Sequence, residues 1–302
     1  MKPINSKILD FYLQYSTYTN PGCYKEFLQS LPNEINELGY LVCHQIIHRI
    51  TLRNGNTGAN AGMKYGDMTK FPWYRLRCED DVLMTAVSMI AELLRLDERG
   101  FVKDRAVENK IVVTCRYVSI LMSAILKAKG IPARSRSGFS PYCSPGSSGD
   151  HWINQYWSEK EERWITFDAE GFYNLAFDQF DIPDDRFDWA AKTWLDIRHG
   201  NTDGKQFVYG DGKGINGLKA VIRAIFYDFH ALMNYELSYK FQPRYINGKF
   251  DTLTETDFQE IDELALIMIH PENNFLELKE VWDTKKKFRL INSPLIGDND
   301  HV

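Results

Sequence analysis

Apolar residues in the middle of the chain change from a helical to an alternating spacing. From Thr114 to Lys129 they recur every three or four positions, which predicts a helix that ends at Gly130 and is stopped by Pro132. Three short segments follow that we predict to be β-strands, at residues 133–139, 151–157 and 163–168. A polar turn lies between the last two, so we expect them to form an antiparallel hairpin.

Helical spacing dominates on both sides of this segment. Upstream, we predict one helix over residues 33–50 and a second that is capped by Asp80-Asp81 and ends before Gly100. A loop rich in Gly and Asn, residues 51–72, separates them and would be either mobile or shaped around a ligand. Downstream, helices are predicted at about 183–197, 218–237, 256–269 and 274–286.

Composition narrows the classes of function. Of the 302 residues, 44% are apolar and 14% are aromatic, which suits a well-buried globular core. The net charge is −5, whereas nucleic-acid-binding proteins usually carry an excess of basic residues. We therefore expect no nucleic-acid partner.

Nothing in the sequence predicts export or insertion into a membrane. The N-terminal residues lack the apolar stretch of a secretion signal, and no run of roughly 18 apolar residues occurs. The five cysteines are scattered, odd in number and free of any CxxC pair, which argues against a disulfide framework and against a structural zinc site. We expect a cytoplasmic protein without a membrane anchor, a bound metal or a cofactor.

Three residues of the central segment have the chemistry of a thiol triad. Cys115 follows Thr114, a plausible N-cap, so its thiol would lie at a helix N-terminus that favours the thiolate. His151 begins one predicted strand and Asp168 ends the next, so antiparallel pairing would bring imidazole and carboxylate side by side. In such a triad the imidazole takes the thiol proton and the carboxylate orients the imidazole. A buried structural Cys and an ordinary His explain the same residues, so spacing alone leaves the triad open.

Acyl transfer also needs N–H donors for the developing oxyanion. The backbone N–H of Cys115 is the default first donor, and Gln45 is a candidate for the second. A solvent-facing helix residue is the simpler interpretation of Gln45. The indole groups of Trp73 and Trp152 could donate or form a wall of the site, although core packing explains both.

Other polar residues near these positions have plainer explanations. His44 and His48 are four residues apart on the predicted helix and could bind a metal, but no third ligand is evident and a helix surface explains them. Cys143 could be a second thiol near the site or a passive loop residue. Asp150 would point to the strand face opposite His151, so we leave it out of the triad.

A longer motif surrounds the three residues. A Cys opens a helix that ends in Gly-Ile-Pro-Ala-Arg, a strand ending in Gly-Phe follows, and His-Trp and Trp…Asp lie on the next two strands. The residues are Cys115-Arg116-Tyr117, Gly130-Ile131-Pro132-Ala133-Arg134, Gly138-Phe139, His151-Trp152 and Trp164 to Asp168. This motif resembles that of the transglutaminase-like superfamily. The resemblance covers roughly residues 110–170, about a fifth of the chain.

The resemblance implies both a fold and a role for each residue of the triad. It implies an α+β fold with a papain-like core, in which the Cys-bearing helix packs on an antiparallel sheet. It also implies that Cys115 is the nucleophile, His151 the general acid and base, and Asp168 the residue that orients His151.

We accordingly expect a single transglutaminase-like domain over residues 1–302. Its core would span about 80–175, with helical parts at 1–79 and 176–302. The chain lacks the CxxC zinc pairs of eukaryotic peptide N-glycanases, and its helical C-terminal third differs from the β-sandwiches of animal transglutaminases. A bacterial stand-alone type is the expectation that remains.

Two functional hypotheses follow. The first is a thiol enzyme that forms an acyl-enzyme on Cys115 and acts on amide bonds of a peptide, a protein or a small molecule. It would either hydrolyse the amide or transfer the acyl group to an amine. The second is a non-catalytic binding or scaffold protein on a transglutaminase-like core, against which the intact Cys, His and Asp argue.

Overall fold

The computed structural model describes residues 6–49, 70–75, 77, 79–143, 146–170, 175–210, 215–246 and 249–290. The predicted loop 51–72 lies almost entirely outside them. The α-helices are α1 (Ser6–Leu13), α2 (Lys25–Gln29), α3 (Ile35–His44), α5 (Ala86–Leu96), α6 (Cys115–Ala128), α7 (Ala190–Arg198), α8 (Leu218–Leu232), α9 (Glu255–Met268) and α10 (Phe275–Thr284). The strands are β1 (Ile46–His48), β2 (Ile111–Val113), β3 (Ala133–Ser140), β4 (Ser148–Ser158), β5 (Arg163–Phe167), β6 (Asp188–Trp189) and β7 (Phe207–Val208).

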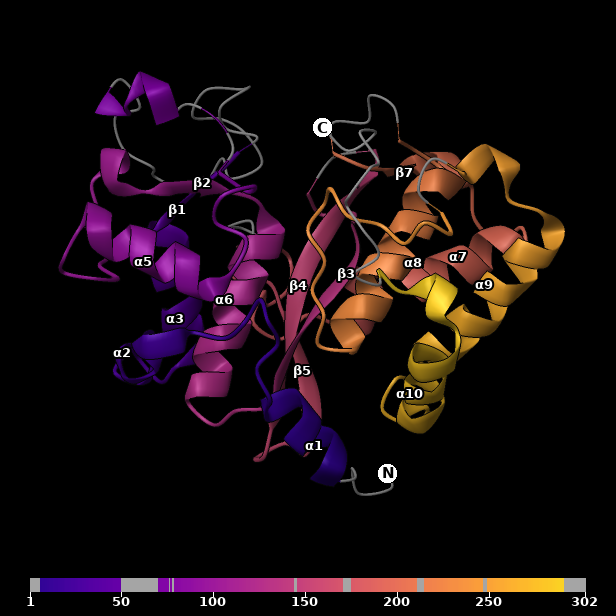
Figure 1. The fold of residues 1–302 in the computed structure, drawn as a ribbon, viewed down its shortest axis with the longest axis horizontal. Coiled ribbons are helices and arrows are strands. Elements are labelled where there is room, and N and C mark those ends of the chain that lie inside the picture. The colour runs from indigo at the N-terminus through magenta and orange to yellow at the C-terminus, as the bar shows by residue number, and fades with distance from the viewer. Residues whose placement is uncertain are drawn as a thin grey trace.

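A twisted sheet stands between two groups of helices (Figure 1). Its strands have the order β5-β4-β3-β6 and pair antiparallel, while β7 pairs in parallel with the start of β4. Helix α6 packs against β3 and β4, and α8 packs against β3. The predicted α+β fold, with the Cys-bearing helix on an antiparallel sheet, is confirmed.

Helix α6 is the centre of the N-terminal group. All of its residues are buried, because the sheet covers one side and α2, α3 and α5 cover the other. Its polar residues have partners there. The Lys127 ammonium donates to the Gln14 carbonyl and to Asn234 Oδ1, each at 2.9 Å. The Arg116 guanidinium donates to the Glu236 carbonyl, so α6 is bound to the chain that follows α8.

A second apolar core lies on the side of α8. It joins α1, α7, α8, α9 and α10, with Trp194, Phe226 and Phe229 fully buried among them. One buried ion pair connects this core to the sheet. The Arg136 guanidinium on β3 donates twice to the Asp228 carboxylate on α8, at 2.8 Å for each bond. The Ser137 backbone N–H also donates to this carboxylate, at 3.0 Å.

The segment formed by α1 and the residues after it contacts the chain at the end of α8. The Tyr12 hydroxyl of α1 donates to the Leu232 carbonyl at the end of α8, at 3.0 Å. The Ser16 hydroxyl donates to a Glu236 carboxylate oxygen at 2.6 Å. The first residues of the described chain therefore complete the packing of the C-terminal part.

The predicted helix 33–50 is wrong at its C-terminal end. Helix α3 stops at His44, and the next residues form β1, which pairs in parallel with β2. Ile46 and Ile47 are β-branched and face Ile111 and Val112 across this pair, where all four side chains are buried. Tertiary pairing thus overrides the helical spacing.

Three other helix boundaries also differ from the sequence expectation. The Thr85 side chain, not Asp80-Asp81, caps α5, through a capping box with Ser88. Helix α7 begins at Ala190 rather than at Pro183, because Asp188 and Trp189 pair with β3 as β6. Helix α8 ends at Leu232, before the predicted residue 237.

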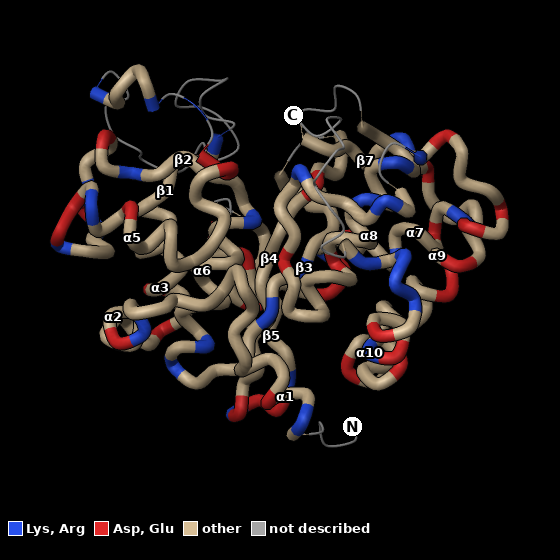
Figure 2. Tube along the Cα trace, in the orientation of Figure 1, with Lys and Arg blue, Asp and Glu red and all other residues tan. Residues whose placement is uncertain are grey.

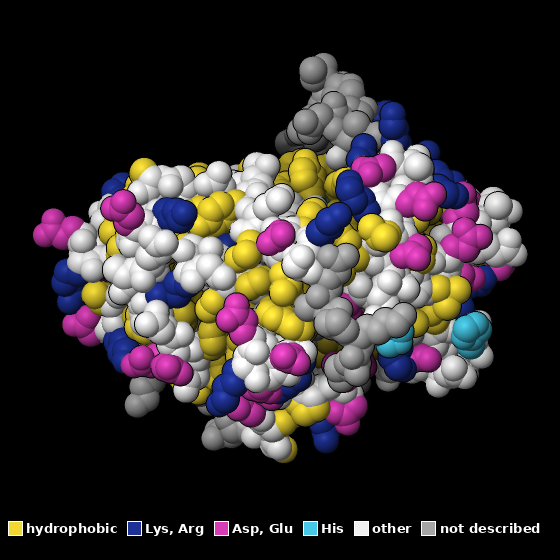
Figure 3. Space-filling view, turned by 90° about the horizontal axis from the view of Figure 1, so that it is seen from below, with side chains coloured by type: hydrophobic (Ala, Val, Ile, Leu, Met, Phe, Trp, Pro, Cys, Tyr) yellow, Lys and Arg dark blue, Asp and Glu magenta, His cyan; other side chains and the backbone are white. Residues whose placement is uncertain are grey.

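Charges of both signs are interspersed along the described trace (Figure 2). The face in Figure 3 shows acidic and basic side chains around scattered apolar ones. Within the described residues, no helix is long and apolar enough to cross a membrane.

The buried ion pair gives a test of how the two cores are held together. Replacing Asp228 with Ala leaves the Arg136 charge buried without its carboxylate, so we expect a loss of about 3–5 kcal/mol in unfolding free energy. The matched control is Asp251→Ala, because Asp251 pairs with Lys219 on the surface and should contribute no more than about 1 kcal/mol. Urea unfolding of both variants measures the difference. Equal stabilities would show that the pair does not hold the cores together.

Candidate active site

Cys115 is the first residue of α6 and follows β2 after a single residue. Thr114 occupies the N-cap position with extended backbone angles, but its side chain makes no capping bond. Its hydroxyl donates to the Asp80 carboxylate at 3.3 Å instead. The N–H groups of the first turn therefore keep the partial positive charge that favours a thiolate at Cys115.

The structure brings His151 and Asp168 together with Cys115. His151 Nε2 lies 2.7 Å from Asp168 Oδ2, and both side chains are buried. The strand pairing ends at Asn154 with Phe167, so Asp168 lies one residue beyond the ladder and reaches diagonally to His151. His151 is also close enough to act electrostatically on the Cys115 thiol, and it lowers the pKa of that thiol.

The Asp168 carboxylate has further partners that fix its position. The Tyr142 hydroxyl donates to Oδ2 at 3.0 Å, and the Glu170 backbone N–H donates to Oδ1 at 3.0 Å. The backbone N–H of Asp168 donates to the Gln179 carbonyl at 2.9 Å. An acceptor held in this way can orient the imidazole without moving itself.

Burial and charge act in opposite directions on the thiol. Burial raises the pKa of Cys115, while the charge of His151 and its hydrogen bond lower it, and the net pKa lies above the ordinary value. Burial alone would lower the pKa of His151, but Asp168, Cys143 and Cys115 outweigh it and hold this pKa well above its usual range. The imidazole is thus basic enough to take the thiol proton.

The C-terminal part of the chain also contributes to the site. The Tyr239 hydroxyl lies 3.1 Å from Cys115 Sγ. The backbone carbonyl of Tyr239 accepts bonds from the Tyr227 hydroxyl at 2.7 Å and from the Arg223 guanidinium at 2.9 Å. The aromatic rings of Trp152, Tyr209 and Tyr227 pack around it.

The two candidate indole groups have different environments. Trp73 is 82% exposed, so it neither lines a buried site nor packs in the core. Trp152 is buried in the same apolar cluster as Cys115. Its indole N–H is buried and has no hydrogen-bond acceptor among the described residues. Buried donors of this kind are rare and call for an explanation.

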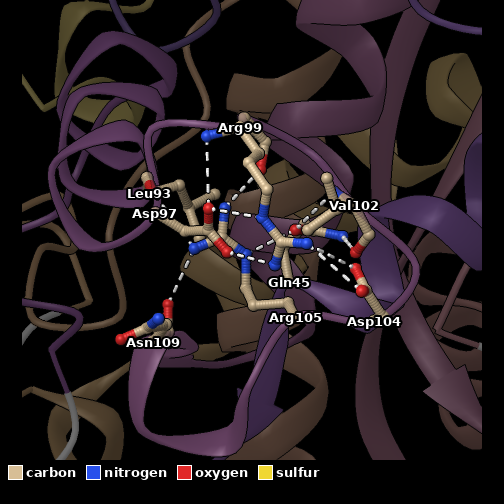
Figure 4. Close-up of polar contacts among 9 residues, drawn as sticks. Gln45, Leu93, Asp97, Arg99, Val102, Asp104, Arg105 and Asn109 are labelled. Carbon is tan, nitrogen blue, oxygen red and sulfur yellow. Dashed lines mark hydrogen bonds and ion pairs between the residues drawn. The ribbon is translucent and has the colours of Figure 1, made fainter.

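The structure argues against Gln45 as an oxyanion donor. Gln45 is fully buried after α3, and its side-chain nitrogen donates to the Leu41 carbonyl and to the Val102 carbonyl, the second of which lies beside it in Figure 4. Its oxygen accepts from the Arg105 guanidinium at 2.6 Å. Both amide protons are therefore used to hold the chain at residues 102–105, and none is left for a substrate.

His48 is not on a helix surface, contrary to the sequence expectation. It is the last residue of β1, opposite Val113, and its Nε2 lies 3.5 Å from Glu170 Oε1. Ligand atoms of His48, Cys115 and Glu170 all lie within 4.8 Å of one another, so these residues could hold a metal ion. His44, in contrast, remains on α3 and bonds the Tyr40 carbonyl through Nδ1.

The remaining candidates are not part of the triad. Cys143 bonds the Ser140 hydroxyl at 2.6 Å, and burial raises the pKa of its thiol to about 12. Asp150 accepts a bond from the Gly210 backbone N–H at 2.6 Å. Cys143 is thus a protonated thiol at neutral pH, and Asp150 serves the neighbouring loop.

Removing the imidazole should separate Cys115 from an ordinary buried thiol. In His151→Ala the thiol keeps its burial and loses its charge partner, so its pKa rises and less thiolate exists at neutral pH. We expect at least about tenfold slower alkylation of Cys115 by iodoacetamide, with the rate profile moved to higher pH.

The exposed Cys23 is the internal control for this experiment. Peptide mass mapping should show an unchanged rate at Cys23 in both proteins. An unchanged rate at Cys115 as well would mean that the two groups are not coupled.

The central segment of the chain is similar to a known protein family. Residues 103–169 match the family model of the transglutaminase-like superfamily. No curated protein matches the chain. A solved structure of a proposed cysteine protease from Cytophaga hutchinsonii is 14% identical and has a TM-score of 0.35. The alignment covers 61% of this chain and 46% of that one, and a likeness this distant carries no weight for the site.

The matched segment contains β2, α6, the hairpin of β4 and β5, and all three residues of the triad. Residues 103–169 are therefore similar to the core of the transglutaminase-like superfamily.

Proposed function

We propose that this protein is a thiol enzyme that acts on amide bonds through an acyl-enzyme on Cys115. One observation supports this above all: a buried thiol at a helix N-terminus is under the electrostatic influence of an imidazole whose Nε2 lies 2.7 Å from a buried carboxylate. Thiol, base and orienting group are the parts that nucleophilic catalysis by Cys requires.

The reaction has two halves with His151 active in both. The Cys115 sulfur attacks the amide carbonyl carbon while its proton passes to His151 Nδ1. The C–N bond then breaks, the amine leaves with that proton, and the acyl group remains on sulfur as a thioester. In the second half, water or a primary amine attacks the thioester and gives its proton to His151. The C–S bond breaks, and the proton returns to the thiol.

Two N–H groups are candidates to stabilise the oxyanion in each half. The backbone N–H of Cys115 lies in the first turn of α6 and has no acceptor within the helix. The Trp152 indole N–H is buried in the same cluster as the thiol and lacks an acceptor in the described chain. A buried donor of this kind is ready to bond charge that develops only in the transition state.

Substrate entry requires a local rearrangement. The Tyr239 hydroxyl lies 3.1 Å from the sulfur, at about the distance that a reacting carbonyl carbon must reach. An acyl group and this hydroxyl cannot both occupy that position. The Tyr239 side chain must therefore turn away from the sulfur before acylation.

An activated ester tests the first half-reaction without knowledge of the natural substrate. We expect p-nitrophenyl acetate to add one acetyl group to Cys115, detected by intact mass and peptide mapping. The adduct should be missing in Cys115→Ala, and it should form at least about a hundredfold more slowly in His151→Ala. Equal acetylation of Cys115 and Cys23 would favour the non-catalytic scaffold.

The same thioester distinguishes hydrolysis from transfer. Decay of the adduct in buffer alone, unaffected by added methylamine, indicates a hydrolase. A decay rate that increases with methylamine and yields N-methylacetamide indicates an acyltransferase.

The role of Trp152 can be separated from that of the base. Acylation passes through an oxyanion, whereas alkylation by iodoacetamide displaces iodide at a saturated carbon and forms none. Trp152→Phe keeps an aromatic ring and removes the N–H, so we expect acetylation to slow by about 10²–10³-fold while alkylation stays within about twofold.

The matched comparison for this experiment is His151→Ala, which should slow both reactions. If Trp152→Phe leaves acetylation unchanged, the indole packs in the core and donates nothing to the oxyanion.

A further inference from the structure

A second imidazole–carboxylate pair lies next to the thiol and has no part in the triad. His48 Nε2 is 3.5 Å from Glu170 Oε1, and their side chains are 13% and 5% exposed. Ligand atoms of these two residues and the Cys115 sulfur all lie within 4.8 Å of one another. Cys115 thus has His151–Asp168 as one neighbouring pair and His48–Glu170 as another.

The backbone holds this second pair firmly in place. His48 lies opposite Val113 in the β1–β2 pair, and Val113 precedes Cys115 by two residues. Glu170 follows Asp168 by two residues, and its backbone N–H is bound to the Asp168 carboxylate. The carbonyl of Ala169 between them accepts a bond from the Cys43 thiol at 2.8 Å. The three ligand groups therefore come from separate elements that already meet at this point.

Imidazole, thiolate and carboxylate form a ligand set that suits Zn²⁺. Tetrahedral zinc with Zn–S of about 2.3 Å and Zn–N or Zn–O of about 2.1 Å places its ligand atoms about 3.3–3.6 Å apart. The separation of His48 and Glu170 already has this value. No other pair needs to close by more than about 1.2 Å, which side-chain rotation can supply.

We propose that His48, Cys115 and Glu170 form a binding site for a divalent transition-metal ion, with Zn²⁺ the best match. Three protein ligands leave a fourth tetrahedral position for water. On binding, a Zn–S bond forms and the S–H bond breaks, and the proton passes to the solvent.

The chemistry of the three side chains suits such binding. A ring nitrogen of His48, the Cys115 sulfur and a Glu170 carboxylate oxygen are all atoms that Zn²⁺ binds in proteins. In the metal-bound state a Glu170 carboxylate and a Cys115 thiolate would supply two negative charges to the doubly charged ion.

The site would act as a reversible block on the thiol. A sulfur bound to zinc shares electron density with the metal and is a weaker nucleophile, and the metal occupies space next to it, so an occupied site should be much less active. This consequence rests on the proposed function, whereas binding itself does not. Removal of the metal would free the thiol to give its proton to His151 again.

Metal binding can be measured without any substrate. Full-length protein stripped with EDTA is titrated with Zn²⁺ against a chromophoric chelator, and with Co²⁺ for its spectrum. We expect one Zn²⁺ per chain, the visible bands of tetrahedral Co²⁺ and a thiolate-to-cobalt charge-transfer band. His48→Ala and Glu170→Gln should each weaken Zn²⁺ binding by about 100-fold or more.

Matched variants separate this site from other metal-binding groups nearby. Cys143→Ser removes a neighbouring thiol and should keep its Zn²⁺ affinity within a fewfold, whereas His151→Ala removes the triad imidazole and should still bind one Zn²⁺ per chain. Zn²⁺ should also protect Cys115 from iodoacetamide in the wild-type protein, and EDTA should reverse the protection. Thermal melting of each variant shows whether a loss of binding merely reflects unfolding. His48→Gln is added because it replaces the imidazole with a side chain of more similar size than Ala.

Two results would overturn the proposal. One is an absence of one-to-one Zn²⁺ binding to the stripped protein. The other is binding that survives His48→Ala and Glu170→Gln but disappears in His151→Ala, because the metal would then use the triad imidazole. Failure of the proposed function would give a different result. In that case the metal-free protein and its His151→Ala variant would show the same rate of Cys115 alkylation.

Discussion

The burial of the Cys115 thiol is the constraint on which the rest of the site depends. Burial raises the pKa of the thiol, although the proposed chemistry needs the thiolate. The chain compensates with an imidazole that Asp168 holds basic and with the uncapped N-terminus of α6. The long hairpin of β4 and β5 brings these groups to one place, and the two apolar cores keep the hairpin between α6 and α8.

The sequence was sufficient where the signals are local. The helix that begins at Cys115, the three antiparallel strands after it and the overall α+β class all follow from short-range spacing and turn residues. The pairing of His151 with Asp168 could be expected for the same reason, because both lie on one hairpin. Only their diagonal offset needed the observed register.

Residues that depend on distant contacts could not be placed from the sequence. Gln45 has a side-chain amide that could donate to an oxyanion. Its oxygen, however, accepts a bond from Arg105, 60 residues away, and this holds the amide inside the protein. His48 has helical spacing with His44, yet pairing with β2 draws it into a strand. Tyr239 follows no motif at all, and only the packing of the chain after α8 brings its hydroxyl to the sulfur.

The contact between α1 and the end of α8 has a consequence for synthesis on the ribosome. Tyr12 and Ser16 find their partners at Leu232 and Glu236, so α1 cannot settle until more than three quarters of the chain has been made. Until then its aromatic residues remain exposed in a nascent chain, where unpaired apolar surface favours aggregation. A ribosome that stalls after β5 would release a chain that already carries the Cys, His and Asp but cannot close the core around them.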